Sequence, residues 1–210
     1  MDRIDGDRLP HDTWKIFIHG RPTTRPGIVG NAIYLNGRNQ YIDFGRNVFC
    51  NGDPETSCSS GFTLSFEIEP QELREDTYFV ASAPVDVYYR NGRLTADVKT
   101  PTKKWSVSTN RLDPDAWYKV DVSWHPKDGL QLYVNGVKVD ERTTWTINRY
   151  YDENANFYFG RANTDMLHEN YAHTLVDNIE LWYARRGELV DRGLVESCKY
   201  QCHRKVAGLN

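Results

Sequence analysis

Two glutamates in one predicted strand have the spacing that most directly suggests catalysis. Glu67 and Glu69 stand two positions apart in the segment 62–69, where apolar and polar residues alternate strictly. Side chains at i and i+2 of a strand point to the same face, so the two carboxylates would lie roughly 7 Å apart, a separation that glycoside hydrolysis can use. Thr63 and Ser65 occupy the same face, so the pattern equally describes the solvated side of an amphipathic strand. We favour the solvated face and keep catalysis as an alternative.

The four cysteines form two close pairs at opposite ends of the chain. Cys50 and Cys58 enclose seven residues rich in turn formers, and Cys198 and Cys202 enclose three. The first spacing suits a local disulfide, whereas neither spacing matches the CxxC pairs common in zinc sites. We expect disulfides Cys50–Cys58 and Cys198–Cys202, with cross-pairing between the two ends, zinc binding and free thiols as open alternatives. Disulfides persist in oxidising compartments, so these pairs predict a secreted, extracellular protein.

Aromatic residues in predicted strands are candidates for ligand contact. Tyr88 and Tyr89 are adjacent, so on a strand their rings point to opposite faces and only one of them can enter the core. Trp105 lies in another predicted strand. Aromatic rings on a sheet can stack on sugar rings, while nearby polar groups bind the hydroxyls. We therefore name Tyr88, Tyr89 and Trp105 as candidate ligand-binding residues, with core packing as the alternative for each.

The segments that would position these residues have the two-residue period of β-strands. The dipeptides Asn91-Gly92 and Asn135-Gly136 each separate two such segments and favour tight hairpin turns, because both residue types accept positive φ. About a dozen short strands, with a helical pattern only around 188–202, predict an all-β fold of two packed sheets. The residues predicted to form its core are Phe62, Leu64, Phe66, Ile68, Trp117, Trp124 and Leu132.

Composition and hydropathy argue against nucleic-acid binding and against a membrane span. The chain has 26 Lys and Arg against 29 Asp and Glu, a net charge of −3, whereas nucleic-acid-binding domains are usually strongly basic. We therefore expect no nucleic-acid partner. No segment approaches the roughly 18 consecutive apolar residues that a transmembrane helix requires, so we also expect no membrane span.

Several segments, in their order along the chain, resemble laminin G-like domains. GIVGNAIYLNGRNQYID (27–43) is similar to their opening strand pair, and DAWYKVDVSW (115–124) followed by LQLYVNG (130–136) is similar to their central signature. FYFGR (157–161) and LVDNIELW (175–182) resemble the closing strands. The resemblance implies a concanavalin A-like jelly roll, a sandwich of two antiparallel sheets.

This resemblance also suggests a division of the chain. We expect an N-terminal extension with a first edge strand in 1–24, the β-sandwich in 25–190, and a C-terminal tail tied by cysteines in 191–210.

The same resemblance implies a bound calcium ion. Laminin G-like domains commonly hold one at the sandwich rim through an aspartate, and Asp86 matches that position. Backbone carbonyls from about 98–100 and from the loop 163–171, to which Asp165 could add charge, would complete this site. Asp177 matches a structural calcium ligand of many jelly-roll lectins and glucanases. The alternatives are an ordinary edge-strand aspartate at the first position and an aspartate bound by backbone donors at the second.

The function implied by the resemblance is noncatalytic binding of a matrix glycan or protein outside the cell. The Glu-x-Asp-x-x-Glu pattern of glucanases on this fold is absent, so we rank a polysaccharide hydrolase or lyase below noncatalytic binding and keep it only as an alternative. The chain also resembles the laminin G-like module of molluscan nacre matrix proteins of the Pif type. That resemblance implies another alternative, a structural framework domain of matrix or biomineral, associated with calcium carbonate or chitin.

Overall fold

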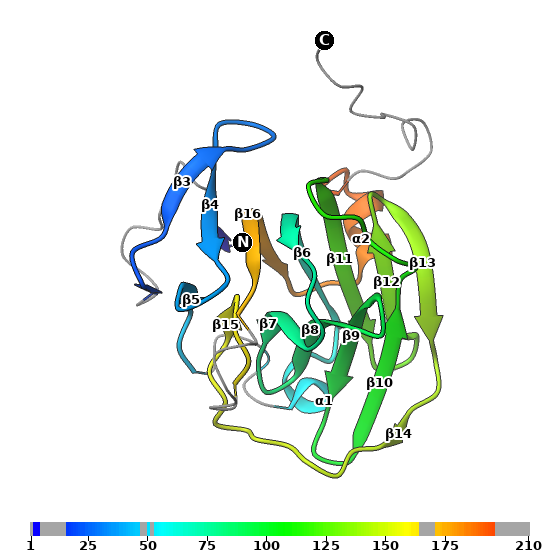
Figure 1. Cartoon of the computed structure of the whole chain (residues 1–210). Helices are drawn as coiled ribbons and strands as arrows, with labels where there is room; N and C mark the ends of the chain where they lie inside the picture. The colour runs from blue at the N-terminus through cyan, green and yellow to red at the C-terminus, as the bar shows by residue number, and fades with distance from the viewer. Residues whose placement is uncertain (1, 5–15, 47–49, 51–52, 164–170, 196–210) are drawn as a thin grey trace.

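Two antiparallel sheets pack face to face in the computed structural model (Figure 1). The model describes residues 2–4, 16–46, 50, 53–163 and 171–195. The first sheet has the order β13-β12-β11-β6-β16-β4-β3, with β1 paired to β16, and the second has the order β14-β10-β9-β8-β7-β15-β5-β2. This arrangement confirms the expected concanavalin A-like sandwich.

The strands of both sheets are short, apart from β6 and β16. Those of the first sheet are β1 (Asp2–Ile4), β3 (Thr23–Pro26), β4 (Asn31–Asn36), β6 (Phe62–Glu72), β11 (Tyr118–His125), β12 (Gly129–Val134), β13 (Val137–Arg142) and β16 (His173–Trp182). Those of the second sheet are β2 (Phe17–His19), β5 (Tyr41–Asp43), β7 (Thr77–Ala81), β8 (Val85–Arg90), β9 (Arg93–Lys99), β10 (Lys103–Ser108), β14 (Thr146–Ile147) and β15 (Tyr158–Phe159). β2 begins at Phe17 and β3 at Thr23, so strands of both sheets begin within the predicted N-terminal segment 1–24.

Alternation along the strands determines which side chains fill the space between the sheets. The apolar face of β6 is fully buried, and β11 and β12 add Trp124 and Leu132 beside it. These residues were predicted to be buried, and the structure confirms it. Trp117 is different: it precedes the start of β11 at Tyr118 and is only half-buried, so the prediction that it belongs to the core is wrong. The reason is the alternation itself: Trp117 and Trp124 stand seven positions apart, so the two-residue period assigns them to opposite faces, and Trp124 is the one that faces the core.

Two Asn-Gly dipeptides close hairpins as predicted. Asn91 and Gly92 join β8 to β9 with φ of 53° and 73°, and Asn135 and Gly136 join β12 to β13 with φ of 50° and 78°. Positive φ at both turn positions matches the twist of the flanking strands, which explains why these residue types stand there.

The predicted loop disulfide Cys50–Cys58 is present and encloses the short helix α1 (Pro54–Ser57). Asp53 caps this helix by accepting a hydrogen bond from the backbone N–H of Glu55. Cys198 and Cys202 lie outside the described residues, so their pairing stays a prediction. Among the described residues, no helix is long and apolar enough to cross a membrane.

The second helix, α2 (Arg186–Asp191), covers part of the outer face of the first sheet beside β11 and β12 (Figure 1). It falls at the start of the stretch that the sequence predicted to be helical. Leu189 packs with Ala184 and Val195 in a small apolar cluster separate from the main core. The helix thus shields polar side chains of β11 that alternate with its core residues.

Candidate functional site

The outer face of the second sheet carries a ladder of charged side chains across three strands. Val85, Val87 and Tyr89 of β8 point into the core, so Asp86 and Tyr88 point outward. Asp86 stands opposite Asp97 of β9 in the strand register. Like charges in directly opposed positions repel one another, so this face needs cations to stabilise it.

Two lysines neutralise this pair of aspartates. Lys99 Nζ lies 2.6 Å from Asp86 Oδ2, and Lys104 Nζ lies 2.6 Å from Asp97 Oδ2. Burial raises the pKa of the Asp86 carboxyl above its ordinary value, because the ionised form loses water, although the Lys99 ammonium opposes the shift. The result is a partly dehydrated network of four charges lying on a sheet face.

Asp97 has one carboxylate oxygen without a partner. Its side chain is 3% exposed, and Oδ2 accepts hydrogen bonds from Tyr88 Oη at 3.0 Å and from Lys104, whereas Oδ1 accepts none. A buried acceptor that lacks a donor costs free energy, and such groups in native proteins usually mark a functional position or a site for water or a ligand. Ser106 of β10 stands opposite Asp97 and is exposed, so this position borders the solvent.

Tyrosine rings continue the same face beyond β8. The Tyr78 ring packs on the Tyr88 ring with centroids 5.2 Å apart, and a bridge from Tyr78 to Tyr171 joins a second group. In that group the Arg161 guanidinium lies over the rings of Tyr41, Tyr158 and Tyr171, at 4.9, 4.8 and 5.9 Å from their centroids. The outer face of the second sheet, which we call the polar face, therefore combines half-buried aromatic rings with charged and hydroxyl groups.

The three predicted ligand-binding aromatics divide between the two sides of the sheet. Tyr88 lies on the polar face, where its hydroxyl contacts Asp97 and its ring is largely covered by Tyr78 and Arg90. Tyr89 and Trp105 are instead buried in the core, and this corrects the expectation that they contact a ligand. Their positions alternate with outward residues, so the pleat directs both rings between the sheets.

The predicted calcium ligands are not brought together. Asp86 is ion-paired with Lys99, and Asp177 Oδ1 accepts the backbone N–H of Asn178 in the first sheet. Asp165 lies outside the described residues. Over the described ranges, no three side chains of the types His, Cys, Asp and Glu form a group that could hold a metal ion. Calcium binding stays a prediction from the family resemblance.

The two carboxylates considered as an alternative for catalysis, Glu67 and Glu69, form hydrogen bonds on the outer face of the first sheet. Glu67 Oε2 accepts a hydrogen bond from Asn178 Nδ2 at 2.7 Å, and Glu69 Oε1 accepts one from Gln71 Nε2 at 2.9 Å. Both are half-buried, and Thr63 and Ser65 on the same face of β6 are buried, so the expectation that this face is solvated is wrong. The segment leading into α2 covers it, and Thr63 Oγ1 donates to the Ala184 carbonyl.

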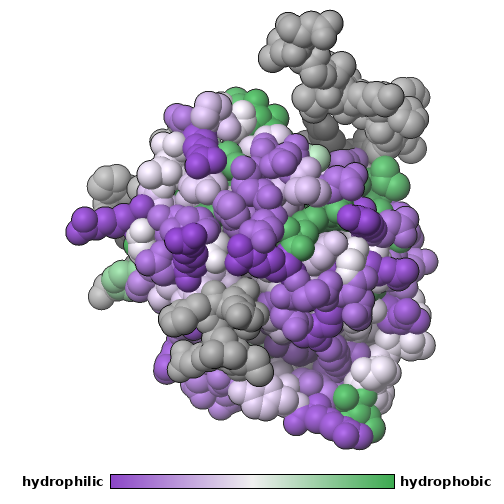
Figure 2. Space-filling model, in the orientation of Figure 1, coloured by the Kyte–Doolittle hydropathy of each residue, from purple (hydrophilic) through white to green (hydrophobic). Residues whose placement is uncertain are grey.

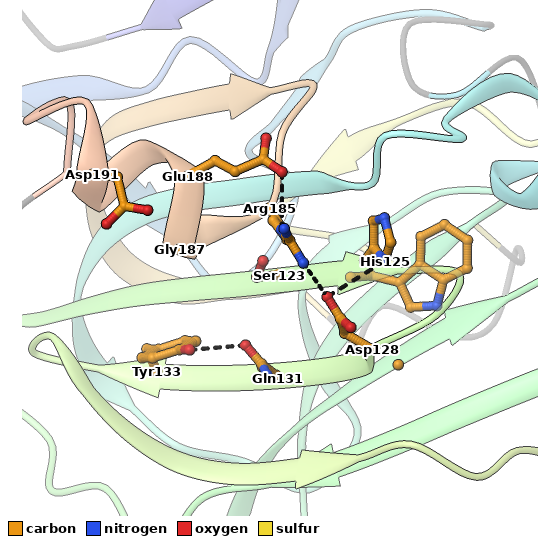
Figure 3. Close-up of a pocket in the computed structure, with 11 residues that line it drawn as sticks. Ser123, His125, Asp128, Gln131, Tyr133, Arg185, Gly187, Glu188 and Asp191 are labelled. Carbon is orange, nitrogen blue, oxygen red and sulfur yellow. Dashed lines mark hydrogen bonds and ion pairs between the residues drawn. The ribbon is translucent and has the colours of Figure 1, made fainter.

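A pocket of about 250 Å³ lies on the other side of the sandwich, between α2 and the outer face of β11 and β12 (Figure 3). Arg185 spans it, donating to Asp128 Oδ2 at 2.7 Å and to Glu188 Oε1 at 2.9 Å. Tyr133 donates to Gln131 Oε1 at 2.8 Å on the sheet side. The lining residues are Ser123, Trp124, His125, Asp128, Gly129, Gln131, Tyr133, Arg185, Gly187, Glu188 and Asp191.

The surface visible in Figure 2 is mainly hydrophilic, and its hydrophobic patches are small and separate. One patch, at the lower right, lies in the region of β14 in Figure 1, and Trp145 and Ile147 of that region are exposed. Large contiguous apolar patches usually mark protein or membrane contacts. No contiguous apolar patch of that size is visible on this face.

One family model matches most of the chain. The family model described as the concanavalin A-like lectin/glucanases superfamily, of the laminin G type, matches residues 34–188. The chain belongs to this superfamily. The match confirms the resemblance seen in the strand motifs, whereas no curated protein sequence matches the chain.

Solved structures share the fold of this lectin/glucanase-type domain at low sequence identity. Domain 4 of AbnA, an extracellular GH43 arabinanase from Geobacillus stearothermophilus solved in complex with arabinotriose, has 16% identity and a TM-score of 0.59 over 79% of this chain and 77% of that chain. The binding domain of Paraclostridial Mosquitocidal Protein 1 has 17% identity and a TM-score of 0.65, and the binding domain of botulinum neurotoxin serotype D/C has 10% and 0.63. Each of these two matches covers 87% of this chain and 48% of the toxin domain, so the chain spans about half their length.

Sequence reasoning missed several residues of these two sites. Asp97 and Lys99 alternate with the apolar residues of β9, so the two-residue period could have assigned both to the outer face. The pocket has no such signal, because Asp128 and Arg185 are far apart in the sequence and meet only when α2 packs on the sheet.

Proposed function

We propose that this domain is a noncatalytic extracellular module that binds a glycan on its polar face. The superfamily includes lectins, and a structure with the same fold was solved with arabinotriose bound. Sugars are recognised by aromatic rings together with planar charged and polar groups that pair with hydroxyls. The polar face presents both kinds of group.

The observation that carries this proposal is the free acceptor of Asp97. Its unpaired Oδ1 lies in a dehydrated position, fixed by Tyr88 and Lys104 through the other oxygen. This oxygen has almost no accessible surface, so a ligand hydroxyl would reach it once the Lys104 side chain, which is 34% exposed, moves aside. The hydroxyl would then form a charge-assisted hydrogen bond and remove the cost of the unsatisfied acceptor. Ser106, directly opposite on β10, offers a hydroxyl at the edge of the same position.

The state of the carboxylates supports a noncatalytic role. Glycoside hydrolysis requires one carboxyl group that gives up a proton and a second one free to act as base or nucleophile. The Oδ2 atoms of Asp86 and Asp97 each contact a lysine ammonium group at 2.6 Å, so neither carboxyl group on this face is free of a counter-ion. Carboxylates held in such pairs suit a site that accepts hydrogen bonds from a ligand.

The extracellular assignment is supported by the disulfide Cys50–Cys58, since such bonds persist mainly in oxidising compartments. The calcium ion implied by the family is part of the proposal and has its own test. Extracellular modules often bind calcium with Kd of about 10⁻⁴–10⁻³ M, so millimolar calcium should raise the melting temperature by a few degrees, reversibly with chelator. Asp86→Asn should abolish the shift and Lys99→Gln should enlarge it if the rim site is correct, whereas Asp177→Asn should abolish it if the closing strand holds the ion.

The glycan proposal is tested by binding to an array of plant, animal and microbial oligosaccharides, chitin oligomers included, followed by calorimetry with the best ligand. Ser106→Trp should block the polar face beside Asp97 and reduce affinity at least tenfold, whereas the matched Ser106→Ala should reduce it only slightly. Asp97→Asn should also weaken binding, because a neutral amide oxygen is a poorer acceptor than a carboxylate.

Two results would contradict the proposal. Binding that is unchanged by Ser106→Trp would exclude the polar face, and cleavage of the bound oligosaccharide by the wild-type chain would exclude a noncatalytic role. Urea denaturation of each variant checks that the loss of binding is not a loss of folding.

A further inference from the structure

The pocket beneath α2 has the properties of a second binding site, on the opposite side of the sandwich from the polar face. On the sheet side it is lined by Ser123 of β11 and Gln131 of β12, which stand opposite one another in the strand register. Their side chains point away from the core, because the residues of β11 that alternate with Ser123 are buried between the sheets. From above it is lined by residues of α2 and by Arg185 just before it (Figure 3). No residue named for the polar face lines this pocket.

A buried ion pair holds α2 in place over this pocket. Arg186 Nε lies 2.8 Å from Asp121 Oδ2, and the backbone N–H of Arg186 donates to Ser123 Oγ at 2.9 Å. The guanidinium also lies 4.1 Å from the centroid of the Tyr133 ring. Thr63 Oγ1 donates to the Ala184 carbonyl at 2.8 Å, which fixes the approach to the helix. The pocket is therefore built into the fold and does not need a ligand to form it.

Open hydrogen-bonding groups of both kinds line the pocket. Arg185 occupies one oxygen each of Asp128 and Glu188, which leaves Asp128 Oδ1 and Glu188 Oε2 as acceptors. Gln131 accepts from Tyr133 through Oε1, so its amide NH₂ remains a donor. His125 Nδ1 accepts the backbone N–H of Lys127 at 3.2 Å and also lies 3.4 Å from Asp128 Oδ2, so in the neutral tautomer that accepts from Lys127 the Nε2–H is a donor.

Size and charge restrict what such a pocket can hold. At about 250 Å³ it is smaller than the roughly 300–1,000 Å³ of sites for drug-sized ligands, so it fits one ring and not an extended chain. Asp128, Glu188 and Asp191 outnumber the single guanidinium of Arg185, so the lining is net negative when His125 is neutral. An anionic ligand would be repelled, whereas hydroxyl groups can both donate to carboxylates and accept from the amide and the imidazole.

We propose that this pocket binds a single uncharged sugar ring, such as the terminal unit of a glycan, and discriminates against uronic and sulfated sugars. The domain would then have two glycan-binding sites on opposite sides of the sandwich, and could link two chains or two branches. This pocket shares no residue with the polar face, so an experiment can reject glycan binding at one of the two sites without rejecting it at the other.

Gly187 allows the site to be blocked with little disturbance. A Cβ added at Gly187 would meet no atom within 4 Å, and this glycine has no positive φ, so Gly187→Trp can be accommodated by the backbone and fills the pocket. Gly187→Ala is the matched control, because its methyl group leaves the cavity open. Gly129 is unsuitable, because it has φ of +77° and an added Cβ would come 2.1 Å from the Arg142 carbonyl oxygen.

The experiment is an NMR titration of the ¹⁵N-labelled chain with a panel of neutral methyl hexosides and pentosides, with methyl glucuronide as the charged comparison. At least one neutral glycoside should shift the Gln131 side-chain amide and the Gly187 backbone amide with a Kd of about 1–10 mM, equivalent to only some 3–4 kcal/mol. Gly187→Trp should abolish these shifts and Gly187→Ala should preserve them. Ser106→Trp, on the polar face, should leave them unchanged.

Four outcomes would overturn the inference. The first three are the absence of any shift at Gln131 and Gly187 across the neutral panel, the persistence of the shifts in Gly187→Trp, and methyl glucuronide binding at least as tightly as the neutral glycosides. Loss of shifts in Ser106→Trp would likewise contradict it, because the sugar would then occupy the polar face.

Discussion

Replacing one member of the Arg186–Asp121 ion pair should destabilise the fold more than replacing both. The side chains are 7% and 1% exposed, and their charged atoms are 2.8 Å apart. In Arg186→Met the Asp121 carboxylate keeps only the hydrogen bond from Ser65 Oγ, at 2.6 Å, and loses its counter-charge in a dehydrated position. Breaking a buried pair by removing one partner costs about 3–5 kcal/mol, and we expect a loss of that size at pH 7.

The double variant, Asp121→Asn with Arg186→Met, removes both charges and keeps a carbonyl oxygen to accept from Ser65. It should lose only about 1–2 kcal/mol, because replacing a whole buried pair by neutral groups is often close to neutral. The cycle of single and double variants should therefore give an interaction energy of about 2–3 kcal/mol or more, which neighbouring residues can reach.

Urea denaturation followed by tryptophan fluorescence measures the stability of each single and double variant at pH 7.5. A deficit below 1 kcal/mol at pH 7.5, or a double variant as unstable as the sum of the two single ones, would refute this reasoning.

Three further predictions concern the loop, the core and the polar face. Replacing Cys50 and Cys58 by serine should cost about 2.5 kcal/mol by freeing the closed loop in the unfolded chain and lower the melting temperature by roughly 5–10 °C, as measured by calorimetry; an unchanged melting temperature would contradict it. Phe66→Ala should cost about 3–5 kcal/mol in urea denaturation, because the ring is fully buried, and a loss under 1 kcal/mol would place the strand in the wrong register. A ¹³C-detected carboxyl titration should find the pKa of Asp86 above its ordinary value because of burial, and higher still in Lys99→Met. That variant should therefore lose stability relative to wild type as pH rises from acidic to neutral, and a pKa lower than in wild type would contradict the assignment.

The sheets were predictable because strand structure is a local property of the chain. The alternation in 62–69 assigned Phe66 to the core and Glu67 to the outer face, and both assignments hold. Tyr88 and Tyr89 had to face opposite sides for the same reason, although choosing between them required the apolar neighbours Val85 and Val87. The same period, counted from Trp124, assigns Trp117 to the outer face, so including Trp117 in the predicted core was an error of register and not a limit of the pattern.

The candidate sites depended on contacts that no local pattern contains. Asp97 is a candidate site residue because Lys104 and Tyr88 both contact its Oδ2 atom. They can do so only because β8, β9 and β10 pair in one particular register. The predicted calcium ligand Asp86 lies on the outer face of the second sheet, and its ion pair with Lys99 is a cross-strand contact that sequence reasoning did not foresee.

By itself the sequence determined the class of fold, the hairpin turns, the local disulfide and the family, because side-chain alternation, the φ preferences of Asn-Gly and a short loop between cysteines act within a few residues of one another. Only the tertiary structure decided which polar groups converge. The pocket brings Asp128 and Gln131 together with Arg185 and Glu188 from a segment more than fifty residues away, once Arg186 has docked α2 on the sheet. The physical reason is that hydrogen bonds and ion pairs depend on distances of about 3 Å between groups in space, and packing sets those distances whereas sequence spacing does not.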